Sequence, residues 1–318
     1  MEPQRLGNYR LLSPLPTNSV TTRVYLTCHA DDEQSQPAFV TKLMPVQTSE
    51  TAALLQAQFE HEIKLLRAFN HPNIPTVHDD GEHAGVRYVV MDNIDGCNLS
   101  TFLGHDRKQP RALTKEMAVY IMGQLADAVR YCHGFTRIDE HGKEVPAGIL
   151  HRDLNPQNIL LSRHGDVMLC DFNSAKSPWL APEHDTVDVG LKAYMAPERI
   201  IGSTPATQQS DLFSLAVILW EILKGQRCFQ ADSDLKTMDA IVRFDISHSG
   251  RRVTGLSTKL SEIVRKNLDR DPGRRYISAF QMLQRLAQAP EAAAAERSRG
   301  VLADQVVQIA DAVAAAAR

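Results

Sequence analysis

His151-Arg152-Asp153-Leu154-Asn155-Pro156-Gln157-Asn158 is the stretch that decides the fold. An aspartate stands five positions before an asparagine, and the apolar run 159–161 follows directly. A turn at 164–166 reverses the chain into a second apolar run, 167–170, which ends at Asp171. Two short apolar runs joined by a turn that contains glycine are typical of a β-hairpin. The pattern therefore predicts a hairpin that brings Asp153, Asn158 and Asp171 close together.

These three side chains offer two kinds of chemistry. The carboxylate of Asp153 can accept a proton from an alcohol. Asn158 and Asp171 offer a carbonyl oxygen and a carboxylate, which are the hard oxygen ligands that Mg²⁺ prefers. A base, a metal ion and accurate positioning are what phosphoryl transfer from a nucleotide requires.

The chain resembles the protein kinases at this point. The His-Arg-Asp-Leu-x-Pro-x-Asn run is similar to their catalytic loop, and Asp171-Phe172-Asn173 is similar to their Asp-Phe-Gly turn. The resemblance, which extends to the eukaryotic-like kinases of bacteria, implies an α+β, bilobal fold with a β-rich small lobe and a mainly helical large lobe. It also implies ATP and Mg²⁺ as cofactors, Asp153 as the base, and Asn158 and Asp171 as the metal ligands.

The composition is that of an ordinary globular protein. The 318 residues, 43% hydrophobic and 23% charged, can bury one large core or two lobes. A net charge of -3 gives no sign of a nucleic-acid surface. The five cysteines are scattered, which favours a reducing cytoplasm over a disulfide framework or a zinc site. The longest apolar run, near 215–223, is too short for a bilayer. We therefore expect a cytoplasmic protein with no nucleic-acid partner and no membrane span.

The loop between the first two predicted strands, 9–12 and 23–27, departs from the family pattern. Kinases have a glycine-rich loop over the phosphates there. With Val24 set at the family's valine, Thr17, Ser19 and Thr22 stand where three glycines belong. Glycine lets backbone N–H groups approach phosphate closely, so this loop can offer hydroxyl donors but cannot copy that geometry in full.

A predicted third strand, 39–43, carries the lysine that pairs with phosphate in the family, Lys42. Alternation places Lys42 on the same face as Val40. A helix is predicted over 50–69, and Glu62 borders its buried stripe, where the family has the glutamate that orients the lysine. A solvated strand lysine is the alternative for Lys42, and Glu60 is the rival for Glu62.

The resemblance places the adenine site after the strand predicted at 86–91. Met91 would be the gatekeeper and 92–94 the hinge, with the C=O of Asp92 and the N–H of Ile94 bonding adenine. The nucleotide-binding residues implied in this way are Thr17, Ser19, Val24, Val40, Lys42, Met91, Asp92, Ile94, Asn158, Leu160, Cys170 and Asp171.

The second half of the chain reads as mainly helical. Helices are predicted over 114–133 and 210–223, and the polar segment 134–148 between the first helix and the catalytic loop is predicted to be an exposed loop. By resemblance, Asp211 holds the backbone of the catalytic loop, or simply caps its helix. Glu198, from the family's Ala-Pro-Glu turn, would pair with Arg275.

The segment after Asp171 holds possible phosphorylation sites. Ser174, Ser177 and Thr186 are the candidates, and Arg152 could pair with a phosphate there. Unphosphorylated polar loop residues are the alternative reading.

Two further departures occur together. Typical serine/threonine kinases have a lysine at the position of Asn155 and a threonine at the position of Leu191. Lys192 could restore the missing charge near the γ-phosphate, or it could be a solvated loop lysine. Asp153, Lys42, Glu62, Asn155 and Lys192 are therefore the candidate catalytic residues.

The predicted organisation has three parts. A small lobe spans 8–92, a large lobe spans 93–289, and an alanine-rich tail spans 290–318, with a helix predicted over 301–318. That helix could pack on the domain, pair with a partner or a second copy of the chain, or remain loosely held.

Two functions fit these observations. One is ATP-dependent phosphorylation of serine or threonine in a protein substrate. The other is that of a pseudokinase, a nucleotide- or protein-binding module that regulates a partner protein. The retained Lys42, Glu62, Asp153, Asn158 and Asp171 favour the enzyme, whereas the loop without glycine, Asn155 and Asn173 favour the pseudokinase.

Overall fold

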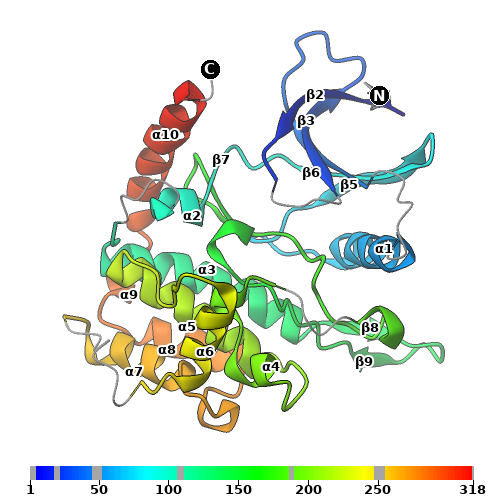
Figure 1. Cartoon of the computed structure of the whole chain (residues 1–318). Helices are drawn as coiled ribbons and strands as arrows, with labels where there is room; N and C mark the ends of the chain where they lie inside the picture. The colour runs from blue at the N-terminus through cyan, green and yellow to red at the C-terminus, as the bar shows by residue number, and fades with distance from the viewer. Residues whose placement is uncertain are drawn as a thin grey trace. The chain divides into compact units, whose positions relative to one another are not determined.

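The chain divides into two compact units (Figure 1). The first contains Met1–Ile94 with Trp179–His184, and the second contains Asp95–Pro178 with Asp185–Arg318. The computed structural model describes residues 5–17, 22–44, 52–105, 111–185, 190–246 and 255–316. The first unit is rich in strands and the second is mainly helical, as the α+β prediction required.

A six-stranded antiparallel sheet and one long helix form the first unit. The strand order is β1-β2-β3-β4-β6-β5, and the cross-strand pairs include Val24 with Lys42 and Val40 with Met91. The bounds are β1 Arg5–Leu6, β2 Tyr9–Leu15, β3 Arg23–His29, β4 Phe39–Met44, β5 Val77–His83 and β6 Val86–Asp92, with helix α1 at Ala52–Ala68.

The two faces of this sheet bury different side chains because residues alternate along each strand. Leu43 and Val90 point into a cluster with Leu6, Tyr9 and Tyr88. Met44 and Val89 lie in a second cluster with Phe59 and Ile63 of α1. Lys42 has the same parity as Met44, so the face that receives α1 also carries Lys42.

A short part of the segment after Asp171 belongs to the first unit. The ammonium of Lys64 on α1 lies 5.1 Å from the ring centroid of Trp179. Such a cation–π contact stabilises by roughly 0.5–1 kcal/mol where it is exposed.

The second unit is built around the buried helix α5. Every residue from Ser210 to Leu223 is buried, in agreement with the apolar pattern. Glu221 accepts bonds from the Tyr194 hydroxyl at 2.7 Å and the Cys228 N–H at 3.0 Å, so its buried carboxyl is paired. The helices of the unit are α2 Leu99–Phe102, α3 Lys115–His133, α4 Pro197–Ile201, α5 Gln208–Lys224, α6 Asp234–Arg243, α7 Thr258–Asn267, α8 Ala279–Ala287, α9 Ala292–Ala295 and α10 Ser298–Ala316.

The catalytic-loop hairpin lies in this unit and is the one the sequence predicts. Strands β10 (Ile159–Ser162) and β11 (Val167–Leu169) are antiparallel, and β7 (Gly96–Asn98) pairs with the other edge of β10.

The C-terminal helix packs on its own unit, as one of the three readings of the tail has it. Leu302, Val306 and Ala310 of α10, red in Figure 1, are buried. Arg299 bonds Asp166 at 2.6 Å in the turn of the catalytic hairpin. Ile309 is only half-buried and Val313 is 37% exposed, so part of the apolar stripe lies at the surface, and self-association through this helix stays a prediction.

The polar segment 134–148, predicted to be an exposed loop, contains regular structure. Strands β8 (Thr136–Ile138) and β9 (Glu144–Pro146) pair as a short hairpin, and Asp139 accepts the N–H groups of His141 and Lys143 in its turn, both at 2.9 Å. Strands this short give no readable alternation. Over the residues that the structure describes, no helix is both long and apolar enough to cross a membrane.

Candidate active site

Lys42 and Glu62 meet in the first unit. The ammonium of Lys42 lies 2.9 and 2.8 Å from the two carboxylate oxygens of Glu62, and the side chains are 11% and 2% exposed. A lysine held by both oxygens of one carboxylate has a fixed position, as binding a phosphate requires. Glu60 does not compete, because it pairs with Arg87 at 2.5 and 2.9 Å and is more than a solvated surface residue.

The predicted hinge follows β6. Met91 is half-buried in β6, and the Asp92 carboxylate accepts the Thr76 N–H at 2.8 Å and lies 2.7 Å from the ring nitrogen of His78. Ile94 is the last residue of the first unit before the chain passes into the second. These contacts fix the Asp92 side chain, and the Asp92 N–H donates to the Thr76 carbonyl at 3.1 Å.

The phosphate loop is described only in part. Thr17 is exposed just after β2, whereas Ser19 lies outside the described residues. Val24 and Val40 are half-buried neighbours of Lys42 on β3 and β4.

Asp153 in the second unit has both carboxylate oxygens bonded by amides. Oδ1 accepts from the Asn155 side chain and from the Leu191 N–H, both at 2.9 Å, and Oδ2 accepts from the Asn158 side chain at 2.9 Å. Asn155 also accepts the Gln157 N–H at 2.9 Å and is 2% exposed. Asn155 and Leu191 thus both bond the aspartate, and they are the two positions at which the family pattern is lost.

The surroundings of Asp153 shift the pKa of its carboxyl upward. Burial raises the pKa of its carboxyl, and the negative charge of Asp171 raises it further, while the Leu191 N–H, His151 and Asn155 only partly oppose this. A raised pKa moves a carboxylate toward the range in which a general base works well.

Asn158, Cys170 and Asp171 are joined through the hairpin. The Cys170 N–H donates to the Asn158 C=O at 3.0 Å, and Leu160, which follows in β10, is half-buried. Because the Asn158 side-chain nitrogen bonds Asp153, its amide oxygen is the atom left for a cation. That oxygen and the Asp171 carboxylate are hard oxygen donors of the kind that Mg²⁺ prefers. No cluster of three or more His, Cys, Asp or Glu side chains that could hold a metal occurs among the described residues.

Left-handed backbone occurs at two of these positions. Arg152 has a φ of 65° and Asp171 a φ of 63°, whereas Asn173 is not among the described residues with positive φ. Asn173 therefore does not adopt the left-handed conformation that asparagine tolerates better than most residues. Gly190 has a φ of 95°, and a Cβ there would lie 2.9 Å from the Arg152 carbonyl oxygen. Glycine is thus required where the chain passes the catalytic loop.

Asp211 holds the backbone of the catalytic loop from α5. Its two oxygens accept the N–H groups of His151 and Arg152, each at 3.0 Å, and it lies 2.8 Å from the ring nitrogen of His133. Burial by itself would raise the pKa of Asp211, but these partners outweigh it and lower the pKa. His133 and Arg199, which donates to the Arg152 carbonyl at 2.7 Å, escaped sequence reasoning because no motif marks a buried partner.

The guanidinium of Arg152 already has an anion. It bonds the Asp185 carboxylate at 2.5 Å and the Ser174 carbonyl at 2.7 Å. Ser177, one of the candidate phosphorylation sites, is 7% exposed, and Thr186 lies outside the described part of the chain. Lys192 is half-buried at the start of a 3-10 turn, one residue beyond Leu191.

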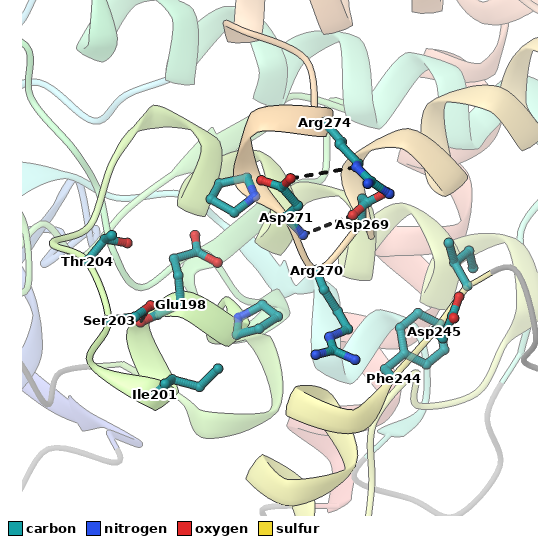
Figure 2. A pocket seen from close by; sticks show the side chains of 13 residues that line it. Glu198, Ile201, Ser203, Thr204, Phe244, Asp245, Asp269, Arg270, Asp271 and Arg274 are labelled. Atoms are coloured by element: carbon teal, nitrogen blue, oxygen red, sulfur yellow. Dashed lines mark hydrogen bonds and ion pairs between the residues drawn. The ribbon is translucent and has the colours of Figure 1, made fainter.

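Glu198 and Arg275 form the expected pair, with Arg275 bonding both carboxylate oxygens at 2.9 and 2.8 Å. Beside it lies a pocket of about 720 Å³ between α4, the end of α6 and the turn at 269–274 (Figure 2). Among its charged side chains, Arg274 faces Asp271 at 3.6 Å, and Asp269 accepts the Asp271 N–H at 2.9 Å. The pocket contains none of the candidate catalytic residues.

Comparison with known proteins agrees with this geometry. The protein kinase domain family matches residues 20–286. A probable serine/threonine-protein kinase of Streptomyces coelicolor is 29% identical over 288 residues, which cover 88% of this chain and 40% of that protein. The serine/threonine-protein kinase PknB of Mycolicibacterium smegmatis is 30% identical over 74% of this chain and 37% of its own length. The chain therefore spans well under half of the length of these curated relatives. Since the family match covers most of the sequence, the chain belongs to the protein kinase domain family.

Proposed function

We propose that this chain transfers the γ-phosphoryl group of Mg-ATP to serine or threonine hydroxyls of a protein substrate. The observation that carries the proposal is the Asp153 carboxylate, held by three amide donors beside the hairpin that joins Asn158 to Asp171. The names of the relatives, serine/threonine-protein kinases, support the choice of acceptor.

In this proposal, the hydroxyl oxygen of the substrate forms a bond to the γ-phosphorus, and the Asp153 carboxylate takes the proton of that hydroxyl. The bond from that phosphorus to the bridging oxygen breaks, and ADP leaves with the electron pair. Lys42, held by Glu62, binds the phosphates of the nucleotide, and the Asn158 amide oxygen and Asp171 hold Mg²⁺. The ion supplies positive charge that stabilises the charge developing on the transferred group.

The remaining nucleotide contacts are proposed by the same correspondence. The backbone of Asp92 and Ile94 would bond adenine beside Met91, and Val24, Val40, Leu160 and Cys170 would border the base. All five cysteines are free thiols, so we assign the reaction to the reducing cytoplasm.

We propose that Lys192 supplies the positive charge that is missing because Asn155 stands where the family has a lysine. It follows Leu191, whose N–H already bonds Asp153. A flexible lysine stem can bring its ammonium to the transferred phosphate.

The second candidate is a pseudokinase that binds nucleotide or a partner protein without transfer. Asn155 favours it, because the side chain that bonds Asp153 carries no positive charge for the γ-phosphate.

A pair of measurements on the full chain separates the two functions. We expect millimolar Mg-ATP to raise the melting temperature, because a ligand that binds the folded state stabilises it. We also expect labelled phosphate from ATP to appear on serine or threonine of the chain itself or of a generic protein substrate. Asp171→Asn should abolish the transfer. A thermal shift without any transfer supports the pseudokinase, and the absence of both rejects nucleotide binding altogether.

A further inference from the structure

The backbone and the side chain of Arg152 each make two polar contacts that hold the residue in place. Its N–H donates to Asp211 at 3.0 Å, and its carbonyl accepts from Arg199 at 2.7 Å. Its guanidinium donates to the Ser174 carbonyl at 2.7 Å and to the Asp185 carboxylate at 2.5 Å. The side chain is only 5% exposed. Buried cations require a paired anion, because removal from water without one is costly.

The backbone of Arg152 depends on these anchors. Its φ of 65° is a left-handed conformation that a residue with a long side chain rarely adopts. Such a conformation persists only where the surroundings hold it. Since Asp153 follows directly, the anchors of Arg152 also fix the position of the proposed base.

Asp185 is shared between two cations. The ammonium of Lys176 lies 3.0 Å from its second oxygen, so one carboxylate bridges Arg152 and Lys176. Burial alone would raise the pKa of Asp185, but Lys176 and Arg152 outweigh it and lower the pKa. The group is therefore a carboxylate at neutral pH.

The bridge also connects two backbone segments. The N–H groups of Leu150 and Lys176 each donate to the carbonyl of the other residue, at 3.0 and 2.8 Å. Leu150 leads into the catalytic loop, and Lys176 belongs to the segment that follows Asp171. Through its two ion pairs, Asp185 therefore connects Lys176 of this backbone pairing to Arg152 of the catalytic loop.

A phosphate on a serine or threonine can pair with an arginine as the Asp185 carboxylate does here, and its charge-assisted hydrogen bonds then order the segment that carries it. We propose that Asp185 is a built-in anion that replaces such a phosphate, so that the catalytic loop is held, and transfer proceeds, without phosphorylation of the segment after Asp171. The claim that Asp185 holds the catalytic loop rests on contacts within one unit. The claim that transfer needs no phosphorylation rests on the proposed function.

The test uses the full chain treated with a phosphatase until its intact mass shows no phosphate. Initial transfer rates are measured for this protein, for the same protein after prolonged autophosphorylation, and for Asp185→Asn, Asp185→Glu and Asp239→Asn. Asp239 is the matched control, since it is 57% exposed in a surface pair with Arg243. Hydrogen exchange of the Leu150 and Lys176 amides is followed in all variants.

Phosphate-free and phosphorylated wild type should have kcat values within twofold of each other. Asp185→Asn should lower kcat at least tenfold with KM for ATP nearly unchanged, and should speed exchange at both amides at least tenfold. Asp185→Glu should recover most of the rate, and Asp239→Asn should match the wild type.

Two results overturn the proposal: a phosphate-free wild type at least tenfold slower than the phosphorylated protein, or an Asp185→Asn variant with unchanged exchange. If the wild type transfers no phosphate at all, the proposed function fails, and the exchange data still decide whether Asp185 holds the loop.

Discussion

Asp153 shows how much a single position depends on neighbours that a motif does not reveal. The sequence shows that a lysine and a threonine are absent at 155 and 191. It does not show that the Asn155 amide and the Leu191 N–H both reach Asp153 Oδ1. The bond from the Leu191 N–H to Asp153 depends on the neighbouring Gly190, because a Cβ at this position would lie 2.9 Å from the Arg152 carbonyl oxygen of the catalytic loop. Motif spacing predicts which residues are present but not how a missing contact is made.

Asn155→Asp tests the role of this amide. The aspartate keeps an oxygen to accept the Gln157 N–H, but it replaces the donor to Asp153 with a second negative charge. A general base contributes roughly 10²–10⁴-fold, so we expect kcat to fall at least tenfold with KM for ATP little changed. Steady-state kinetics measure both constants, and a wild-type kcat in this variant contradicts the assigned contact.

The pKa of Asp153 gives a second prediction at this scale. Burial first, and then the charge of Asp171, raise it above the ordinary value of 3.8, so the proton is retained to higher pH than in an exposed aspartate. If Asp153 is the base, activity is lost on acidification at a higher pH than for an ordinary carboxylate. A ¹³C titration of the carboxyls in nucleotide-free protein measures this pKa directly, with the resonance assigned by its loss in Asp153→Asn. A midpoint at or below 3.8 is the contrary result.

At the scale of elements, the sequence predicts those with a strong period. Helices α1, α3 and α5 begin and end within about two residues of their predicted bounds because apolar stripes and caps such as Thr114 mark them. Strand β5 was missed, since Val77–His83 is mostly polar and has no apolar alternation. The hairpin of β8 and β9 was missed because each strand has three residues. Both are stabilised by pairing with a neighbouring strand, which a local pattern does not encode.

Helix α1 distinguishes two glutamates that are close in sequence. Glu62 is buried against Lys42, whereas the Glu60 side chain is 41% exposed in its pair with Arg87. We expect Glu62→Ala to lower kcat strongly, as Lys42→Met should, with the fold retained. Glu60→Ala should leave kcat unchanged and reduce stability by less than about 1 kcal/mol, because exposed ion pairs contribute little. Transfer assays and urea unfolding measure these effects, and equal loss of activity in the two alanine variants contradicts the placement of the helix.

At the scale of the whole molecule, residues far apart in sequence maintain the site. Asp185 is 33 positions from Arg152, and Asp211 is 59 positions from it. Resemblance to a family supplied the Glu198–Arg275 and Asp211 contacts in advance, because their motifs are recognisable. It could not supply Asp185, which no motif marks. The folded chain therefore adds most where this sequence departs from its family.

Glu198→Gln tests the long-range framework of the second unit. Burial alone would raise the pKa of Glu198, but Arg275 outweighs it and lowers the pKa, so the ionised pair stabilises the fold above pH 4.5 and this contribution is lost as the pH falls further. The side chains of Arg275 and Glu198 are 0% and 4% exposed. Leaving Arg275 buried without its counter-charge should cost roughly 3–5 kcal/mol at neutral pH. Urea unfolding measures this loss, and a change below about 1 kcal/mol contradicts it.

The measurement that tests the account most directly is the rate of phosphate transfer by Asp153→Asn, with Asp239→Asn as the control. Both variants remove one negative charge, but only the first removes the proposed base. Purified full chain is mixed with Mg²⁺ and labelled ATP, and label on protein is counted with time. The account predicts transfer by the wild type and the control, and a loss of at least a hundredfold in Asp153→Asn. Transfer at the wild-type rate by Asp153→Asn, or none by the wild type while Mg-ATP binds, contradicts it.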